Sequence, residues 1–145
     1  ITENDRFIES FPGETVRLEE RSSEGFRYKV PHVGWNGIHL PASAENGALS
    51  GESPAQWRGS PLQGLHKGDF MYFVHSFYPV PEDAEVVLST TWHGDIEFCS
   101  SLRRDNIFAC QFHPERSGSQ GIQVYRNMAD ILAKRDDGIE GNQDA

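Results

Sequence analysis

The sequence predicts an α/β fold in which a run of short β-strands is closed by a C-terminal helix. Apolar and polar residues alternate with a period of two in several segments before residue 113, as in strands that bury one face. Beyond Ser117 the apolar residues recur instead at helical spacing: Ile122, Tyr125, Met128 or Ala129, and Leu132. The change from a period of two to helical spacing indicates that the strand region ends near residue 113 and that the helix begins soon after it.

The strand candidates follow one another with turn signals between them. Segments 14–20 and 26–30 predict a β-hairpin that runs on into 31–36. The apolar segment 70–74 predicts a strand that continues to Tyr78, where Pro79 and Pro81 are expected to end it. Three further short strands are expected, at 85–91, 96–102 and 106–113.

Residues 41–68 are poor in apolar side chains and rich in Gly, Ser, Pro and Ala. This composition predicts a long surface connection with a short helical turn around 54–58.

The last helix has start and stop signals. Ser117 or Ser119 can serve as its N-cap, and Gly138 can terminate it. Lys134 and Arg135 would then lie in its last turn, where positive charge suits the helix dipole. We therefore expect one domain portion over 1–138 and a disordered acidic tail over 139–145.

Composition excludes several functions. The chain has 145 residues and a net charge of −9, without a Lys/Arg cluster that could neutralise phosphates, which argues against a nucleic-acid partner. The sequence shows neither an apolar run of membrane-spanning length nor a signal peptide, so we expect no membrane partner and a cytoplasmic location. Cys99 and Cys110 read as reduced core thiols rather than as a disulfide.

His113 and Glu115 are the strongest catalytic candidates. Pro114 disfavours the helical conformation for His113, and side chains two residues apart on an extended segment share a face. A carboxylate there can accept the Nδ1 proton of the imidazole and leave Nε2 free as a base. Surface pairs of this kind are common, but this one lies between a strand and a helix, where α/β sheets build their sites.

A nucleophile to match this pair is missing. Cys99 and Cys110 lie within strand-like runs and lack the sharp glycine-flanked turn that activates a cysteine, so core packing is expected for both. No cofactor is expected either: the sequence has no glycine-rich phosphate loop, and its six histidines lack a compact metal-ligand spacing.

Two further features remain open on residues alone. His75 and Ser76 lie at the end of the most apolar strand. They could face a ligand, or His75 could have a purely structural role, with its hydrogen bonds made within the protein. Trp35, between Gly34 and Asn36, suits an interface or a lid.

Three segments together resemble a known family. Residues 29–36 (KVPHVGWN), 72–78 (YFVHSFY) and 106–118 (NIFACQFHPERSG) fall in the order found in class I glutamine amidotransferases. Within that family they are similar to the glutaminase subunits of imidazole glycerol phosphate synthases. The similarity extends from about Phe11 to about Lys134.

The resemblance implies a three-layer, flavodoxin-like α/β fold, of which this chain would be the β-rich C-terminal part with its closing helix. It also implies glutamine as substrate, hydrolysed to glutamate and ammonia through a cysteine thioester. The ammonia would pass to a (βα)8-barrel cyclase subunit, the protein partner, which forms imidazole glycerol phosphate in histidine biosynthesis.

The resemblance also implies roles for individual residues. His113 matches the base of a Cys-His-Glu triad and Glu115 matches its orienting carboxylate. Residues matching positions that hold glutamine are Ser76 and Phe77, and those bordering the pocket are Pro31, His32, Val33 and Gly34. The partner interface and ammonia gate would contain Trp35, Tyr72 and Arg116. The family usually has lysine at position 116, and arginine can still make a cation–π contact with an aromatic such as Trp35.

The family carries its nucleophilic cysteine, on a Gly-x-Cys-x-Gly elbow, upstream of the region found here. We therefore expect a truncated chain, starting at Ile1, that does not hydrolyse glutamine by itself. Two alternatives stay open: a paralogue that supplies ammonia to a sugar-modifying synthetase for surface polysaccharides, with which 96–99 is compatible, and a non-catalytic docking module.

Overall fold

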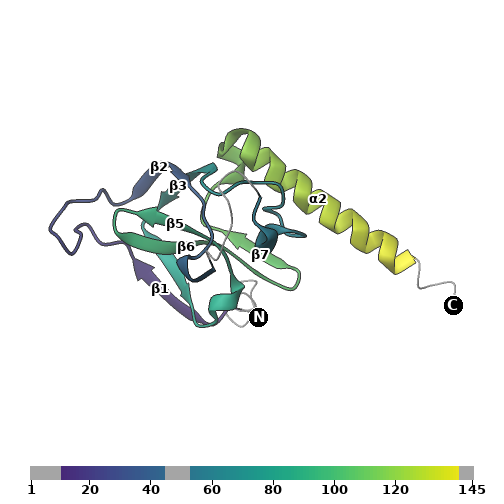
Figure 1. Ribbon diagram of the computed structural model, residues 1–145, viewed down its shortest axis with the longest axis horizontal. Coiled ribbons are helices and arrows are strands. Elements are labelled where there is room, and N and C mark those ends of the chain that lie inside the picture. The colour runs from purple at the N-terminus through teal and green to yellow at the C-terminus, as the bar shows by residue number, and fades with distance from the viewer. Residues whose placement is uncertain (1–10, 45–52, 141–145) are drawn as a thin grey trace.

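The computed structural model describes residues 11–44 and 53–140, and it has the predicted mixed α/β character, with a body of strands and one long helix (Figure 1). The strands are β1 (Gly13–Arg17), β2 (His32–Gly37), β3 (Phe70–His75), β4 (Phe77–Pro81), β5 (Val87–His93), β6 (Ile96–Arg104) and β7 (Ile107–Cys110). The helix is α2 (Gly118–Glu140), and short 3-10 turns are η1 (Ala42–Ala44), η2 (Ala55–Trp57), η3 (Ala84–Val86) and η4 (Pro114–Arg116).

In the described part of the chain the strands form small open antiparallel sheets. β1 pairs with β4, β2 pairs with β3, and β5, β6 and β7 form a three-stranded sheet in that order. A bridge between His39 and Thr90 links the end of β2 to β5. This mixture of open sheets and a closing helix is consistent with the class I glutamine amidotransferase fold.

The partner of the first strand differs from the prediction. The expected hairpin between 14–20 and 26–30 is reduced to one isolated bridge, between Arg21 and Arg27, and β1 instead pairs with β4. The hydrogen bond from the Leu18 N–H to the Ser76 carbonyl, at 2.8 Å, extends that pairing. Alternation predicts a strand and its buried face, but it does not identify the partner.

Pro79 lies inside β4 and Pro81 is its last residue, so the prediction that these prolines end the strand is wrong for Pro79. In a strand every second N–H points to the same side. The Glu82 N–H donates to the Pro12 carbonyl at 2.9 Å, which shows that the even-numbered positions face β1. The prolines occupy the alternate positions, where no donor to β1 is needed, so both are tolerated.

The segment that was expected to be a surface connection contributes to the core. Trp57, Leu62 and Leu65 are buried in the main apolar cluster, together with Ile38, Leu40, Met71, Phe73, Phe98, Phe112 and Val124. The Trp57 Nε1–H also donates to the Leu88 carbonyl at 2.7 Å. The predicted helical turn is present as η2. The segment has few apolar residues, so its composition predicted a surface connection. Those few residues are large, however, and they are buried in the core.

The three strands expected between 85 and 113 are confirmed as β5, β6 and β7, although β7 ends at Cys110 rather than at 113. Ser89, Ser100 and Ser101 are buried at the β5–β6 interface, where the Ser89 hydroxyl is within hydrogen-bonding distance of both partners. This local polar packing lies beside an irregularity in the strand register at Ser89.

Most of the apolar residues whose spacing predicted helix α2 lie away from the core, although Met128 packs against it. Ile122, Tyr125 and Leu132 are about half exposed, at 52%, 48% and 59%. The buried positions are Ser117, Gly121, Val124 and Asn127. Both sets of residues fit the helical period. The set that contains Gly121 faces inward, because Gly121 lies directly against the Pro114 carbonyl, where a side chain would clash.

The helix is also longer than expected. It continues through Gly138 to Glu140, so Lys134 and Arg135 are not in its last turn. The first two residues of the expected tail are therefore helical, whereas 141–145, like 1–10, lie outside the described residues. No helix in the described ranges combines the length and apolarity needed to cross a membrane.

Candidate active site

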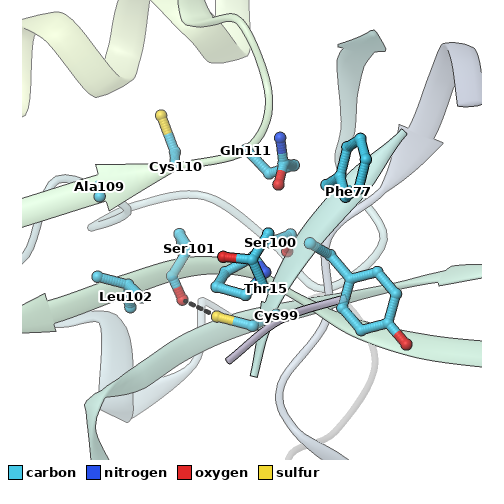
Figure 2. Close-up of a pocket in the computed structure, with 11 residues that line it drawn as sticks. Thr15, Phe77, Cys99, Ser100, Ser101, Leu102, Ala109, Cys110 and Gln111 are labelled. Carbon is cyan, nitrogen blue, oxygen red and sulfur yellow. Dashed lines mark hydrogen bonds between the residues drawn. The ribbon is translucent and has the colours of Figure 1, made fainter. Parts of the chain in front are cut away.

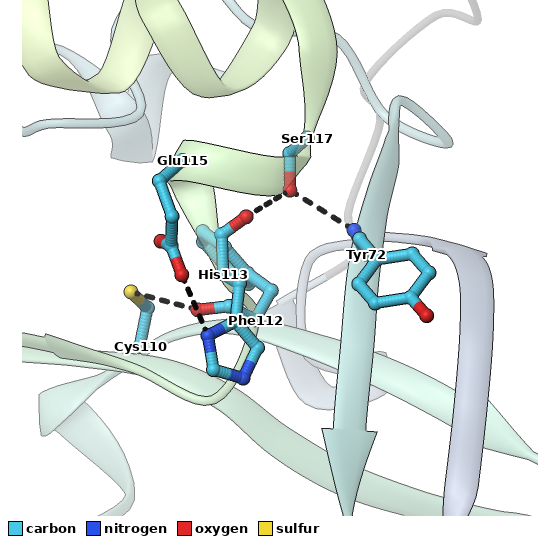
Figure 3. A network of polar contacts seen from close by, with 6 residues as sticks. All are labelled: Tyr72, Cys110, Phe112, His113, Glu115 and Ser117. Atoms are coloured by element: carbon cyan, nitrogen blue, oxygen red, sulfur yellow. Dashed lines mark hydrogen bonds and ion pairs between the residues drawn. The ribbon is translucent and has the colours of Figure 1, made fainter.

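His113 and Glu115 are in contact at the junction between β7 and α2. The His113 Nδ1 lies 2.9 Å from Glu115 Oε1 (Figure 3). His113 is extended, with φ −102° and ψ 97°, but Pro114 begins the 3-10 turn η4, so Glu115 is no longer on an extended segment. The predicted contact is present for a different reason: the turn, rather than strand alternation, brings the carboxylate back to the imidazole.

The contact orients the imidazole and favours the ionised form of Glu115. The pKa of the Glu115 carboxyl lies below its usual value, mainly because its own backbone N–H donates to it and additionally because of His113 and the Tyr125 hydroxyl. An ionised carboxylate can only accept, so His113 Nδ1 carries a proton, and in the neutral imidazole Nε2 is the nitrogen with the lone pair. The pair can therefore act as an oriented general base.

Ser117 ties this pair to strand β3. Its hydroxyl accepts a hydrogen bond from the Tyr72 N–H at 3.0 Å and donates one to the His113 carbonyl at 2.6 Å (Figure 3). The His113 N–H in turn donates to the Tyr72 carbonyl at 2.9 Å. Ser117 is fully buried. It immediately precedes α2, as a cap would, but its hydroxyl holds the His113 backbone against β3.

Neither cysteine is suited to nucleophilic attack in this structure. Burial raises the pKa of both thiols, Cys99 and Cys110, to about 12, so they are protonated at neutral pH. Cys99 Sγ donates to the Ser101 carbonyl and Cys110 Sγ to the Phe112 carbonyl, each at 3.4 Å. Both observations fit the expectation that these cysteines pack in the interior.

A pocket of about 260 Å³ opens between β4, β6 and β7 (Figure 2). Its lining residues are Thr15, Phe77, Tyr78, Pro79, Cys99, Ser100, Ser101, Leu102, Ala109, Cys110 and Gln111. Of the two residues expected to hold glutamine, Phe77 lines this pocket and Ser76 does not. Ser76 lies between β3 and β4, where its carbonyl accepts from Leu18.

The expected pocket border is divided between interior and surface. His32 is buried, stacked on Phe73 with a centroid distance of 5.1 Å. Val33 is about half exposed, and Gly34 adopts φ +134°, a conformation that favours glycine. Pro31 precedes β2 and is exposed. Pro31 therefore lies just before β2, and the other three are its first residues, with the His32 and Val33 side chains on different faces rather than in one continuous wall.

Trp35, Tyr72 and Arg116 come together on the outer face of the β2–β3 pair. Trp35 and Tyr72 lie opposite each other in register and make an edge-to-face contact with a centroid distance of 5.9 Å. The Arg116 guanidinium lies 5.0 Å from the centroid of the Tyr72 ring, so its cation–π partner is Tyr72 rather than Trp35. Val33 and Val74, also paired and partly exposed, extend the apolar surface along the same strands.

Comparison with known proteins assigns the chain to a family. It is 38% identical over 138 residues to imidazole glycerol phosphate synthase subunit HisH of Syntrophotalea carbinolica, covering 90% of this chain and 59% of that protein. The chain belongs to the HisH family. It is also 38% identical to HisH of Moorella thermoacetica and 41% identical to HisH of Aquifex aeolicus, over 86% and 69% of this chain and 49% and 41% of those proteins. No protein-family profile matches the chain.

Membership of the HisH family confirms the resemblance to glutaminase subunits of imidazole glycerol phosphate synthase. The chain spans about half of the length of the curated relatives it matches. Within the described ranges, no three His, Cys, Asp or Glu side chains gather as a metal ion would require.

Several residues that shape this HisH-family site were missed from the sequence. Ser117 was interpreted as a helix cap, although its partners come from β3 and the turn before it. His75 was left undecided between a ligand and a structural role, and it lies against His32. Tyr125 was considered only for its helical spacing, and its hydroxyl reaches Glu115. Each contact depends on tertiary packing, for which the sequence offers no local signal.

Replacing Ser117 with alanine should destabilise the protein. The substitution leaves the Tyr72 N–H without its partner and removes one of two donors to the His113 carbonyl, which also accepts from the Arg116 N–H at 3.0 Å. We therefore expect the free energy of unfolding to fall by about 1–3 kcal/mol. The measurement is the urea midpoint of the full-length protein. The control Ser119→Ala, at an exposed position, should change stability by less than about 0.5 kcal/mol. Equal midpoints for the two variants would contradict this role for Ser117.

Proposed function

We propose that this chain is the C-terminal portion of a glutaminase subunit that hydrolyses glutamine and supplies ammonia for imidazole glycerol phosphate formation in histidine biosynthesis. Its HisH relatives support the pathway and favour it over the polysaccharide paralogue. The observation that carries the chemistry is the 2.9 Å contact between His113 Nδ1 and Glu115 Oε1, which prepares Nε2 as a base.

In this proposal the nucleophile is a cysteine in sequence that precedes the chain described here. Its thiol gives up a proton to His113 Nε2 as the sulfur adds to the glutamine carboxamide carbon. That proton then passes from Nε2 to the leaving nitrogen as the C–N bond breaks, releasing ammonia and a glutamyl thioester. A water molecule then loses a proton to Nε2 and attacks the thioester, which gives glutamate and restores the thiol. Glu115 orients the imidazole and stabilises it when protonated.

We also propose roles in glutamine binding for residues at the start of β2 and at the junction between β3 and β4. Ser76 and Phe77 hold glutamine, and Pro31–Gly34 border its site. The pocket beside Phe77 supports this placement, since Gln111, close in sequence to His113, also lines it. Without the nucleophile, residues 1–145 alone are not expected to hydrolyse glutamine.

We also propose that the outer face of β2 and β3 binds a (βα)8-barrel cyclase subunit and lies on the ammonia path. Trp35 is 54% exposed, and it packs against Tyr72, which Arg116 covers. Clustered exposed aromatic residues beside an arginine are typical of the energetic centre of an interface. The complex would be a cytoplasmic heterodimer, a location with which the unpaired Cys99 and Cys110 agree.

Substitution of the proposed base should stop the chemistry and leave assembly intact. In the full-length subunit bound to its cyclase partner, His113→Ala should slow glutamate release by at least about 100-fold, because general base catalysis is lost. Glutamate formation and partner affinity are measured together. His66→Ala, at an exposed position far along the chain, is the control and should retain the wild-type rate. Unchanged glutamate release by His113→Ala would refute its role as the base.

The proposed interface has its own test. Trp35→Ala and Tyr72→Ala should each weaken binding to the cyclase about tenfold or more, or release ammonia that the cyclase does not use. Calorimetric titration measures the first effect, and the ratio of glutamate to imidazole glycerol phosphate measures the second. Trp92→Ala removes a tryptophan of similar exposure, 46%, from β5 and should alter neither. Wild-type affinity and stoichiometry in both interface variants would count against this face.

A further inference from the structure

Two buried histidines meet behind the segment that is proposed to hold glutamine. His32 in β2 and His75 in β3 are paired in the strand register, and His32 Nδ1 lies 2.9 Å from His75 Nε2. His75 Nδ1 lies 3.0 Å from the Phe77 carbonyl oxygen. The mechanism proposed above uses neither imidazole.

Hydrogen-bonding rules allow one arrangement of protons when both rings are neutral. The Phe77 carbonyl can only accept, so His75 carries its proton on Nδ1 and its Nε2 is an acceptor. His32 must then donate from Nδ1, which leaves its own Nε2 to accept from the Asn36 side-chain amide, 3.4 Å away. The Asn36 orientation is fixed in turn by its bond to the Trp92 carbonyl at 2.7 Å.

The surroundings keep both rings neutral. His32 and His75 are buried among Phe73 and Phe98, with ring centroids between 4.8 and 5.9 Å from one another. Burial lowers the pKa of His75 and lowers that of His32 to about 4. Both imidazoles are therefore uncharged near neutral pH, and the proton arrangement persists.

The hydrogen bond from His75 to the Phe77 carbonyl lies where the chain passes from one strand pair to the next. Ser76 is the point where the chain leaves the β2–β3 pair and enters the β1–β4 pair. The Ser76 carbonyl is held by the Leu18 N–H at 2.8 Å, and the Phe77 carbonyl is held by His75. The Phe77 ring meanwhile projects to the pocket and is 53% exposed. The backbone is thus anchored inward while the side chain faces outward.

From this geometry we propose that His75 is a positioning residue, which fixes the Ser76–Phe77 segment for glutamine binding by donating from Nδ1 to the Phe77 carbonyl, while His32 fixes the tautomer of His75. The inference rests on the proposed function, because it assigns Ser76 and Phe77 to glutamine. His75 does not touch the reacting atoms; it acts through the backbone of Phe77.

The test uses two substitutions that each preserve one nitrogen position of His75. Asparagine places an amide N–H near the position of Nδ1, whereas glutamine places its amide near Nε2 and loses the donor to Phe77. In the full-length subunit bound to its cyclase, His75→Asn should keep KM for glutamine within about twofold of wild type. His75→Gln should raise KM about tenfold, corresponding to one lost hydrogen bond, with a smaller change in kcat.

The outcomes separate this inference from the function on which it rests. An inactive wild-type complex would refute the proposed glutaminase. An active wild type with equal KM values for His75→Asn and His75→Gln would refute the positioning role and leave the glutaminase standing. A readout without catalysis is the imidazole ¹⁵N spectrum: His32 and His75 should both show the Nδ1–H tautomer. His93, whose Nε2 donates to the Lys29 carbonyl at 3.0 Å, should show the opposite tautomer, and Nε2–H at His75 would overturn the inference.

Discussion

The hydroxyl of Ser117 makes the contact on which the candidate site depends. It joins the Tyr72 N–H of β3 to the His113 carbonyl, and the His113 N–H returns to Tyr72. Three elements, β3, η4 and α2, thereby meet at one point, and the backbone that carries the imidazole is held against the strand. Tyr72 also faces Trp35 and Arg116 on the outer surface, which places the proposed base and the proposed interface on the same short piece of β3.

Strand β3 therefore serves two purposes in this account. Its buried side chains, Met71 and Phe73, belong to the main core, and its backbone and outer residues organise the site. At its C-terminal end His75 directs the chain into β4 and the pocket beside Phe77. The same rigid strand supports chemistry on one side and assembly on the other.

The sequence predicted those parts of the structure that local patterns determine. Alternation identified β5 to β7 and helical spacing identified the helix. The His113–Glu115 contact was also predicted, although the turn at Pro114 rather than strand alternation produces it. Alternation did not identify β4 as the partner of β1, because that pairing joins segments about sixty residues apart. The helical spacing predicted α2 but could not identify its buried face, since two stripes share the same period. Ser117 and the His32–His75 pair required tertiary contacts that no spacing in the chain reveals.

The central claim is that His113 and Glu115 serve a nucleophile other than Cys99 or Cys110. The most direct test treats the full-length subunit, bound to its cyclase, with a glutamine analogue in which a diazoketone replaces the carboxamide, followed by peptide mass spectrometry. The account predicts alkylation, blocked by excess glutamine, at a cysteine outside residues 1–145, with Cys99 and Cys110 unmodified. Glutamine-protected alkylation of Cys99 or Cys110 would contradict it.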